Sequence, residues 1–190
     1  MNKVIERKKA VDSRVLAVVQ GDRAAAQELL IELLPRVGNL VRYLIGTDSD
    51  VEDITQRVLI ELLRSLHTYR GESQLTTWTD RITIRTTLSY IKRRRVVSAR
   101  KYDIAERSSS AQGNREEENP ERSLVHREAV RVLDELPEEQ RAAVVLHFVV
   151  GMSVPELAEE LAIPFETVRS RLRLGLRKLR DRFGVTKDDL

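Results

Sequence analysis

Residues 153–180 read SVPELAEELAIPFETVRSRLRLGLRKLR, and this stretch predicts two helices joined by a tight turn. Ser153 stands at an N-cap position with Glu156 three residues later, which is the pattern of a capping box. Pro164 lacks an N–H donor and disfavours a helical residue before it, so a second helix begins near Phe165. A capped helix, a turn and a second helix are typical of a helix-turn-helix, whose second helix enters the DNA major groove.

The second helix of this stretch is amphipathic and strongly basic. Between residues 164 and 182 there are seven Lys or Arg residues and two acids. A helix that is only solvated more often mixes both signs of charge, so the imbalance favours DNA binding over a plain helical hairpin with a solvated face. Its apolar face is expected to contain Phe165, Val168, Leu172, Leu176 and Leu179.

The composition of the whole chain fits small helical domains. Of 190 residues, 33% are charged, 41% are hydrophobic and only 4% are aromatic, with a net charge of +3. The chain length suits one or two domains. Because there is no cysteine, disulfides and thiolate metal sites are excluded. No apolar run approaches the length of a membrane span and no signal-peptide core is present, so we expect a cytoplasmic protein without a membrane partner.

Helical periodicity predicts four helices in the first half of the chain. Pro35 should end or kink the second of them, because proline removes a backbone donor inside a helix. The expected helices cover about 12–21, 22–45, 48–66 and 75–94, after a polar tail over 1–11 and with a loop over 67–77.

Residues 103–122, DIAERSSSAQGNREEENPER, hold almost no large apolar side chains. Such a stretch buries too little area to offset its ordering entropy, so it predicts a flexible linker. Two further helices, over about 125–136 and 136–151, lead into the opening stretch. The predicted fold class is all-α, with two small helical domains over 12–100 and 125–184 joined by a linker over 101–124.

Two separate stretches, in this order, resemble one family. The first, residues 21–95, contains Tyr69-Arg70-Gly71, Trp78 and a closing basic run, and the second, residues 133–180, contains the helix-turn-helix. The chain resembles the bacterial extracytoplasmic-function (ECF) sigma factors of the sigma-70 family, with their regions 2 and 4. The resemblance implies a subunit that binds core RNA polymerase, recognises the −35 and −10 promoter elements and promotes strand opening. It also implies an anti-sigma partner, since many members are held by one.

The resemblance assigns polymerase binding to the third predicted helix. Asp53 and Gln56 match the family's polar docking motif, and such groups form directional hydrogen bonds with arginines on a partner. Arg57 departs from the pattern, because the family usually has glutamate there. Phosphorylation of nearby Thr55 is one hypothesis for restoring the missing negative charge.

The resemblance assigns the −10 element, as a single strand, to the loop and the helix after it. An aromatic face stabilises an unstacked base by about 1–3 kcal/mol, and basic side chains contact phosphates. Trp78 is also expected in the core, organising the loop, and Arg85 stands near a position where many relatives have asparagine. The expected −10 residues are Tyr69, Arg70, Gly71, Trp78, Arg85, Lys92, Arg93, Arg94 and Arg95.

The −35 element, as a duplex, is assigned to the second helix of the opening stretch. Arginine binds guanine through two hydrogen bonds in the major groove, which gives discrimination of about 1–3 kcal/mol. We expect base-edge contacts from Arg169, Ser170 and Arg173, and phosphate contacts from Thr167, Arg171 and Arg177.

Two other classes of function compete with a sigma factor. A stand-alone repressor or activator would also carry a helix-turn-helix, but it would bind duplex DNA by itself, usually as a dimer. An enzyme is disfavoured, because His67, His126 and His147 lie far apart and no phosphate loop or nucleophile elbow is present. We therefore expect no catalytic residue, no metal and no cofactor.

Overall fold

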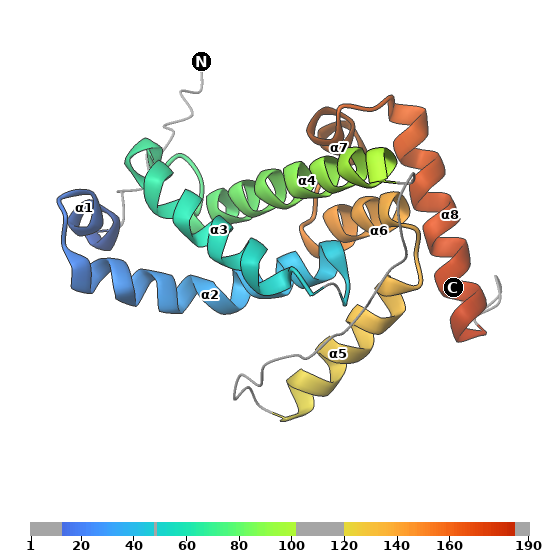
Figure 1. Ribbon diagram of the computed structural model, residues 1–190, viewed down its shortest axis with the longest axis horizontal. Helices are drawn as coiled ribbons and strands as arrows, with labels where there is room; N and C mark the ends of the chain where they lie inside the picture. Colours follow the sequence, from blue (N-terminus) through green and yellow to red (C-terminus); the bar gives the residue numbers. More distant parts are fainter. Residues whose placement is uncertain (1–12, 48, 102–119, 185–190) are drawn as a thin grey trace, which may run out of the picture. The chain divides into compact units, whose positions relative to one another are not determined.

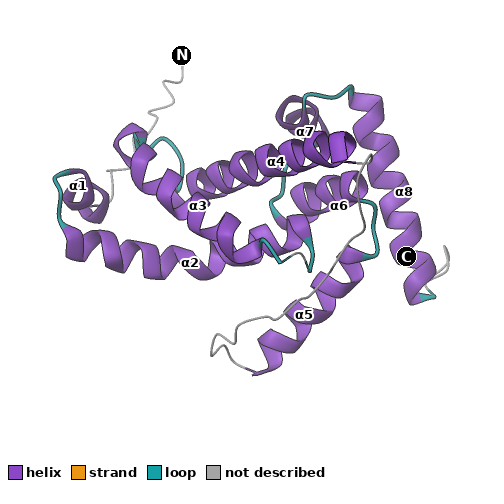
Figure 2. Cartoon of the chain, viewed as in Figure 1, coloured by secondary structure: helices purple, strands orange, loops and turns teal. Residues whose placement is uncertain are grey.

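The computed structural model describes residues 13–47, 49–101 and 120–184, and over these ranges it contains helices and no strand (Figure 2). The all-α prediction is therefore confirmed. Contacts divide the chain into two compact units, one within residues 1–41 and 50–107 and the other within 42–49 and 108–190. The polar tail over 1–11 and most of the expected linker lie outside the described residues.

The first unit is built from four α-helices and one short 3-10 turn, which follow the predicted order (Figure 1). Along the chain these are α1 (Ser13–Val19), α2 (Arg23–Ile45, of which the first unit includes the part up to Val41), α3 (Val51–Ser65), the 3-10 turn Leu66–Thr68 and α4 (Leu75–Lys101). The last helix extends seven residues beyond the predicted end at Arg94.

Pro35 does not end α2, so the first of the two alternatives predicted for it, an end or a kink, is wrong. The helix continues through Pro35 to Ile45, and Figure 2 draws it as one element. Proline inside a helix costs about 3 kcal/mol relative to alanine. The residues on both sides of it offset this cost, because Leu33, Val37 and Val41 are all buried with exposed fractions of 4% or less.

An ion pair and an apolar cluster hold the helices of the first unit together. Arg36 of α2 donates two hydrogen bonds to Asp80 of α4, at 2.7 and 2.6 Å. This hydrogen bonding raises the pKa of Arg36, so the guanidinium remains charged. The apolar cluster joins α1, α2 and the 3-10 turn through Val15, Leu29, Leu33 and Leu66, with Val18, Tyr69, Leu75 and Trp78 packed against it.

The second unit contains the helix-turn-helix. Its helices are α5 (Pro120–Asp134), α6 (Glu138–Val144), which continues as a π-helical turn over Val145–Val149, α7 (Val154–Leu161) and α8 (Phe165–Phe183). Helix α8 packs against both α6 and α7. A Cβ atom at Gly175 would lie 2.9 Å from a methyl carbon of Val144, so the glycine permits the close approach of α8 to α6.

The opening stretch folds as predicted around its turn. Ser153 and Glu156 form the capping box at the start of α7. Ala162 ends that helix in the left-handed region at φ 52°, and Pro164 is the N-cap residue of α8. Val168 and Leu172 are buried as expected, whereas Phe165 is 43% exposed because it stands at the first position of α8.

Helix α5 begins at Pro120, inside the range predicted as linker. Its first residues, Pro120 to Arg122, are polar and lack the apolar periodicity on which the prediction depended. No helix in the described part of the chain is both long and apolar enough to cross a membrane.

Candidate nucleic-acid interface

The exposed face of α8 carries the arginines that were expected to read DNA. Arg169, Arg173 and Arg177 are exposed, and Thr167 and Ser170 are half-buried beside them. Arg169 lies 3.6 Å from Glu166, and its guanidinium carbon is 5.9 Å from the ring centre of Phe165. Because both members of this ion pair are more than 60% exposed, it restrains Arg169 only weakly.

Other basic side chains of α8 are engaged by α6 and the residues before it. Arg171 donates to Glu139 at 2.6 Å, and Arg182 donates to Glu135 at 2.9 Å. Lys178 donates to the backbone carbonyl of Glu135. Arg171, for which a phosphate contact was expected, is thus engaged by Glu139 of α6, and 21% of its side chain is exposed.

The loop before α4 is organised by two aromatic rings. The Tyr69 hydroxyl donates to the backbone carbonyl of Ser73 at 2.7 Å, which closes the loop. The Tyr69 and Trp78 ring centres are 5.5 Å apart and tilted by 59°, and both rings pack against the apolar cluster. Gly71 is buried at φ 71°, a conformation that other residues rarely adopt. The neighbouring Arg70 is exposed.

The expected polymerase-binding residues share the surface of α3. Asp53, Gln56 and Arg57 are all exposed and follow each other at helical spacing. Thr55 is different, because its side chain is buried and its hydroxyl donates to the Val51 carbonyl at 2.7 Å. A kinase would have to pull this hydroxyl out of the helix packing, so the phosphorylation hypothesis for Thr55 is not supported.

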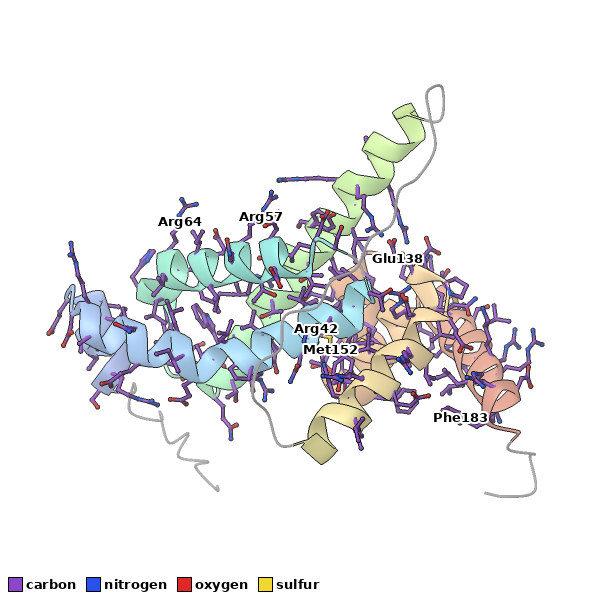
Figure 3. All side chains as sticks on the ribbon, turned by 60° about the horizontal axis from the view of Figure 1, so that its bottom comes forward. Arg42, Arg57, Arg64, Glu138, Met152 and Phe183 are labelled. Atoms are coloured by element: carbon purple, nitrogen blue, oxygen red, sulfur yellow. The ribbon has the colours of Figure 1, made fainter. Side chains whose placement is uncertain are left out.

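A groove between α3 and α4 brings together residues that the sequence analysis treated separately. Its volume is about 870 Å³, and it is lined by Arg57 and Arg64 from α3 and by Trp78, Arg85 and Arg93 from α4, among others. Figure 3 labels Arg57 and Arg64, which extend from the side of α3 that faces away from α2. The groove thus joins a residue expected to bind polymerase with residues expected to bind DNA.

Three residues of this groove were missed by the sequence analysis. They are Arg64 of α3 and Arg81 and Tyr90 of α4. Arg64 is two turns after Arg57, Arg81 is one turn before Arg85, and Tyr90 lines the groove near Arg93. The i, i+4 spacing of Arg81 and Arg85 was readable from the sequence. The facing of α3 and α4 was not, because it depends on how the two helices pack.

Tyr90 is fixed by a short hydrogen bond from its hydroxyl to the Asp50 carboxylate. Burial raises the pKa of Tyr90 to about 12, and the hydrogen bond to Asp50 adds to this rise. The nearby Arg57 acts in the opposite direction. The Arg94 guanidinium lies over the Tyr90 ring at 5.9 Å, and the other basic residues of the predicted run, Lys92, Arg93 and Arg95, are exposed.

The described residues also bear on metal binding. Within those ranges, no three His, Cys, Asp or Glu side chains are grouped so that they could hold a metal ion. The exposed arginines of α8 and those that line the groove between α3 and α4 suit an anionic partner such as nucleic acid.

Comparison with known proteins gives two family matches. Residues 29–96 match sigma-70 region 2, and residues 126–179 match sigma-70 region 4. The chain is 34% identical over 163 residues to the ECF RNA polymerase sigma-E factor of Escherichia coli K12, covering 82% of this chain and 84% of that protein. It is also 34% identical over 168 residues to the ECF RNA polymerase sigma factor SigE of Mycolicibacterium smegmatis, covering 85% of this chain and 63% of that protein.

Two solved structures share the fold at 18% sequence identity. The sigma factor RpoE from Bartonella quintana, in complex with the anti-sigma factor NepR, matches with a TM-score of 0.58 over 85% of this chain and 98% of that chain. CnrH, in complex with the cytosolic domain of CnrY, matches with a TM-score of 0.52 over 92% and 97%. Together with the family matches and the close relatives in sequence, these findings show that the chain belongs to the ECF sigma factors of the sigma-70 family.

Proposed function

We propose that this sigma factor binds core RNA polymerase, recognises a −35 and a −10 promoter element, and promotes strand opening for transcription initiation. The observation that carries the proposal is the presence of two different basic surfaces, one in each unit. One is an exposed row of arginines on a helix-turn-helix, and the other is an aromatic loop beside a basic groove.

The second unit is proposed to read the −35 element as duplex DNA. Arg169 and Arg173 project from the first half of α8, which is the part of a recognition helix that contacts base edges. Ser170 lies between them, and Thr167 and Arg177 flank them as phosphate contacts. Arg171 is left out of this set, because Glu139 holds it.

The first unit is proposed to capture the −10 element as a single strand. The loop that Tyr69 closes onto Ser73 holds Arg70 and Gly71 in a fixed conformation beside Trp78. A preformed loop of this kind loses little entropy when an unstacked base enters it. Lys92, Arg94 and Arg95 follow on α4 as phosphate contacts.

Polymerase binding is proposed for the exposed face of α3. Asp53 and Gln56 offer a carboxylate and an amide to solvent on a helix whose other side is packed into the core. Polymerisation chemistry would belong to the core enzyme, since sigma factors are not catalytic. Because core polymerase and promoters are in the bacterial cytoplasm, the proposal places this protein there.

An anti-sigma factor is proposed as a further partner. The similar solved structures are complexes with NepR and with the cytosolic domain of CnrY, so proteins of this fold do bind such regulators. Purification of the tagged chain from cells under non-inducing and stress conditions would test this. A regulator should copurify in place of core polymerase when the sigma factor is inactive. If core polymerase alone copurifies under all conditions, the proposed anti-sigma partner is contradicted.

Reconstitution with core RNA polymerase tests the proposed function. The purified chain and core enzyme should form a complex on gel filtration, and the complex should produce run-off transcripts from cognate promoters that core enzyme alone does not produce. A chain that leaves core enzyme unbound, but shifts palindromic duplex DNA by itself as a dimer, would instead be a stand-alone regulator.

A further inference from the structure

The end of α2 belongs to the second unit, although the rest of that helix belongs to the first. The division between the units falls after Val41, inside a helix that continues to Ile45. Residues 42–47 contact α5 and α6 of the second unit, and these contacts are called the clasp below. We propose that the closed clasp keeps the free sigma factor from engaging both promoter elements, and that it opens in the transcribing complex.

An aromatic pair forms one side of the clasp. The rings of Tyr43 and of His126 in α5 meet edge to face, with their centres 4.8 Å apart. The Tyr43 hydroxyl and the Nδ1 atom of His126 also share a hydrogen bond of 2.8 Å. Leu44 and Ile45, the next residues of α2, are both buried. Because the two rings are packed and hydrogen-bonded at once, the clasp fixes the orientation of the helix end.

Asp134, the last residue of α5, forms the other side of the clasp. The Thr47 hydroxyl donates to its Oδ2 atom at 2.6 Å, and Arg141 of α6 lies 3.0 Å from its Oδ1 atom. The Arg141 side chain is 9% exposed and also donates to the backbone carbonyl of Leu136 at 3.4 Å. Asp134 thus joins the end of α2 to a buried guanidinium through charge-assisted hydrogen bonds, which are stronger than neutral ones.

Gly46 fits between the two sides because it has no side chain. Its φ is 76°, and a Cβ atom there would collide with the carboxylate of Asp134 and the guanidinium of Arg141. A helix end in solvent would use glycine only for the positive φ, whereas this collision arises from the second unit. The backbone of α2 therefore approaches the ion pair as closely as glycine allows.

The closed clasp limits the distance between the two DNA-binding surfaces. Tyr69 and Trp78 pack against a cluster that includes Leu29, and from Leu29 to Tyr43 is about 21 Å of helix. The described part of the second unit, about 70 residues, is about 30 Å across. These lengths allow a separation of about 50 Å, whereas about 25 base pairs of straight duplex between the −35 and −10 elements span about 85 Å. The clasp must therefore open before both elements are bound, a step that rests on the proposed function.

Two variants open the clasp by different means. Tyr43→Phe with Thr47→Val removes both hydrogen bonds of residues 42–47 and keeps the shapes of the side chains. The loss of two hydrogen bonds should shift the ratio of closed to open chains on the order of thirtyfold towards the open form. Gly46→Ala instead introduces the Cβ atom that collides with the ion pair. Arg182→Ala is the matched control, because it removes an ion pair of the second unit that does not involve residues 42–47.

Double electron–electron resonance on the full-length chain measures the opening directly. The chain contains no cysteine, so Glu28→Cys and Glu159→Cys place one spin label on an exposed residue of each unit. The free chain and the Arg182→Ala control should give the same narrow distance distribution, and both opening variants should give longer and broader ones. Circular dichroism should show that all variants fold. A broad distribution in the free chain, or an unchanged one in both opening variants, would overturn the inference.

Transcription separates the clasp from the proposed function. A closed state lowers the apparent affinity of a protein for its partner by the fraction that is open. The opening variants should therefore reach half-maximal run-off transcription with core polymerase at a sigma concentration on the order of tenfold lower than the unchanged chain needs. An unchanged half-maximal concentration in variants that open would overturn the inhibitory role of the clasp alone. If no chain supports transcription with core polymerase, while the distances still lengthen in both opening variants, the proposed function is overturned and the clasp stands.

Discussion

Helix α8 and the groove between α3 and α4 are both rich in arginine, but they use it differently. On α8, Arg171 and Arg182 pair with Glu139 and Glu135, so part of the basic charge holds the helix-turn-helix to α6. In the groove, Arg57 and Arg64 have no such partners among the described residues. Arginines held by carboxylates outside their own helix stabilise the fold, and arginines without such partners are available to a ligand.

This difference teaches how a charged helix should be interpreted. A count of basic residues on α8 suggests a wide DNA-binding surface, but the ion pairs reduce it to the narrow row of Arg169, Arg173 and Arg177. A count on α3 suggests a mixed, unremarkable surface, since Asp53 and Glu61 are present. Only the opposing α4 reveals that its arginines belong to a basic groove.

The largest effect should come from the available arginines of α8. Arg169→Ala with Arg173→Ala removes two base contacts of about 2 kcal/mol each, which corresponds to roughly 1,000-fold weaker −35-dependent transcription. Run-off transcription with reconstituted holoenzyme measures this. Arg182→Ala is the control, because that arginine is on the same helix and is held by Glu135. Equal losses in both variants would remove the distinction between available and paired arginines.

A smaller effect is expected from the paired arginine of the first unit. Arg36→Ala leaves the Asp80 carboxylate, whose side chain is 10% exposed, without its two hydrogen bonds. Because Arg36 itself is half-exposed, the free energy of unfolding should fall by about 2 kcal/mol, less than for a fully buried pair. Trp78 is the single tryptophan and packs in the first unit, so its fluorescence in urea reports this change. Arg23→Ala should leave the midpoint unchanged.

The paired arginine of α8 should have a still smaller effect on stability. Arg171→Ala removes an ion pair whose side chains are 21% and 47% exposed, worth about 0.5–1 kcal/mol. Urea unfolding followed by circular dichroism should show this loss, while the Trp78 transition stays in place. Affinity for the −35 duplex should hardly change. A large loss of duplex affinity with unchanged stability would mean that Arg171 contacts DNA after all.

The last effect appears only at high pH and concerns the edge of the groove. The pKa of Tyr90 is raised to about 12 by burial and by the hydrogen bond to Asp50, compared with an ordinary value of 10. A group whose pKa is raised on folding contributes stability below its unfolded pKa and loses it as the pH rises through the folded value. The urea midpoint of the first unit should therefore fall between pH 10 and pH 12. In the Tyr90→Phe variant the urea midpoint should fall less over this interval. An equal fall of the midpoint in both proteins would contradict the role of Tyr90.

Local features of the fold could be predicted from the sequence. The capping box of Ser153 and Glu156 and the turn before Pro164 depend on residues a few positions apart, so the pattern contains all the information needed. The buried positions of Val168 and Leu172 follow from helical spacing for the same reason. The loop was located from Gly71 and Ser73, and the resemblance to the family assigned Tyr69 to it.

Features that depend on packing could not be predicted. The pairing of Arg171 with Glu139 joins residues 32 positions apart, and it exists only because α8 packs against α6. The prediction for Pro35 considered only the local cost of a proline inside a helix. The burial of Leu33 and Val37 on the same helix outweighs that cost. Arg57 was assigned by its place on α3, although its surroundings are set by the position of α4.

Sequencing of transcripts from a randomised promoter library tests the central claim most directly. Holoenzymes containing the unchanged chain, the Arg169→Ala and Arg173→Ala variant, or the Arg57→Gln and Arg64→Gln variant would be compared. Base contacts determine which sequence is recognised, whereas phosphate contacts only position the protein on the DNA. The α8 variant should therefore lose its base preference at the −35 element alone. The groove variant should give less transcript from every promoter, while the base preferences at the −35 and −10 elements stay unchanged. A groove variant with altered base preference, or with undiminished yield, would contradict the account.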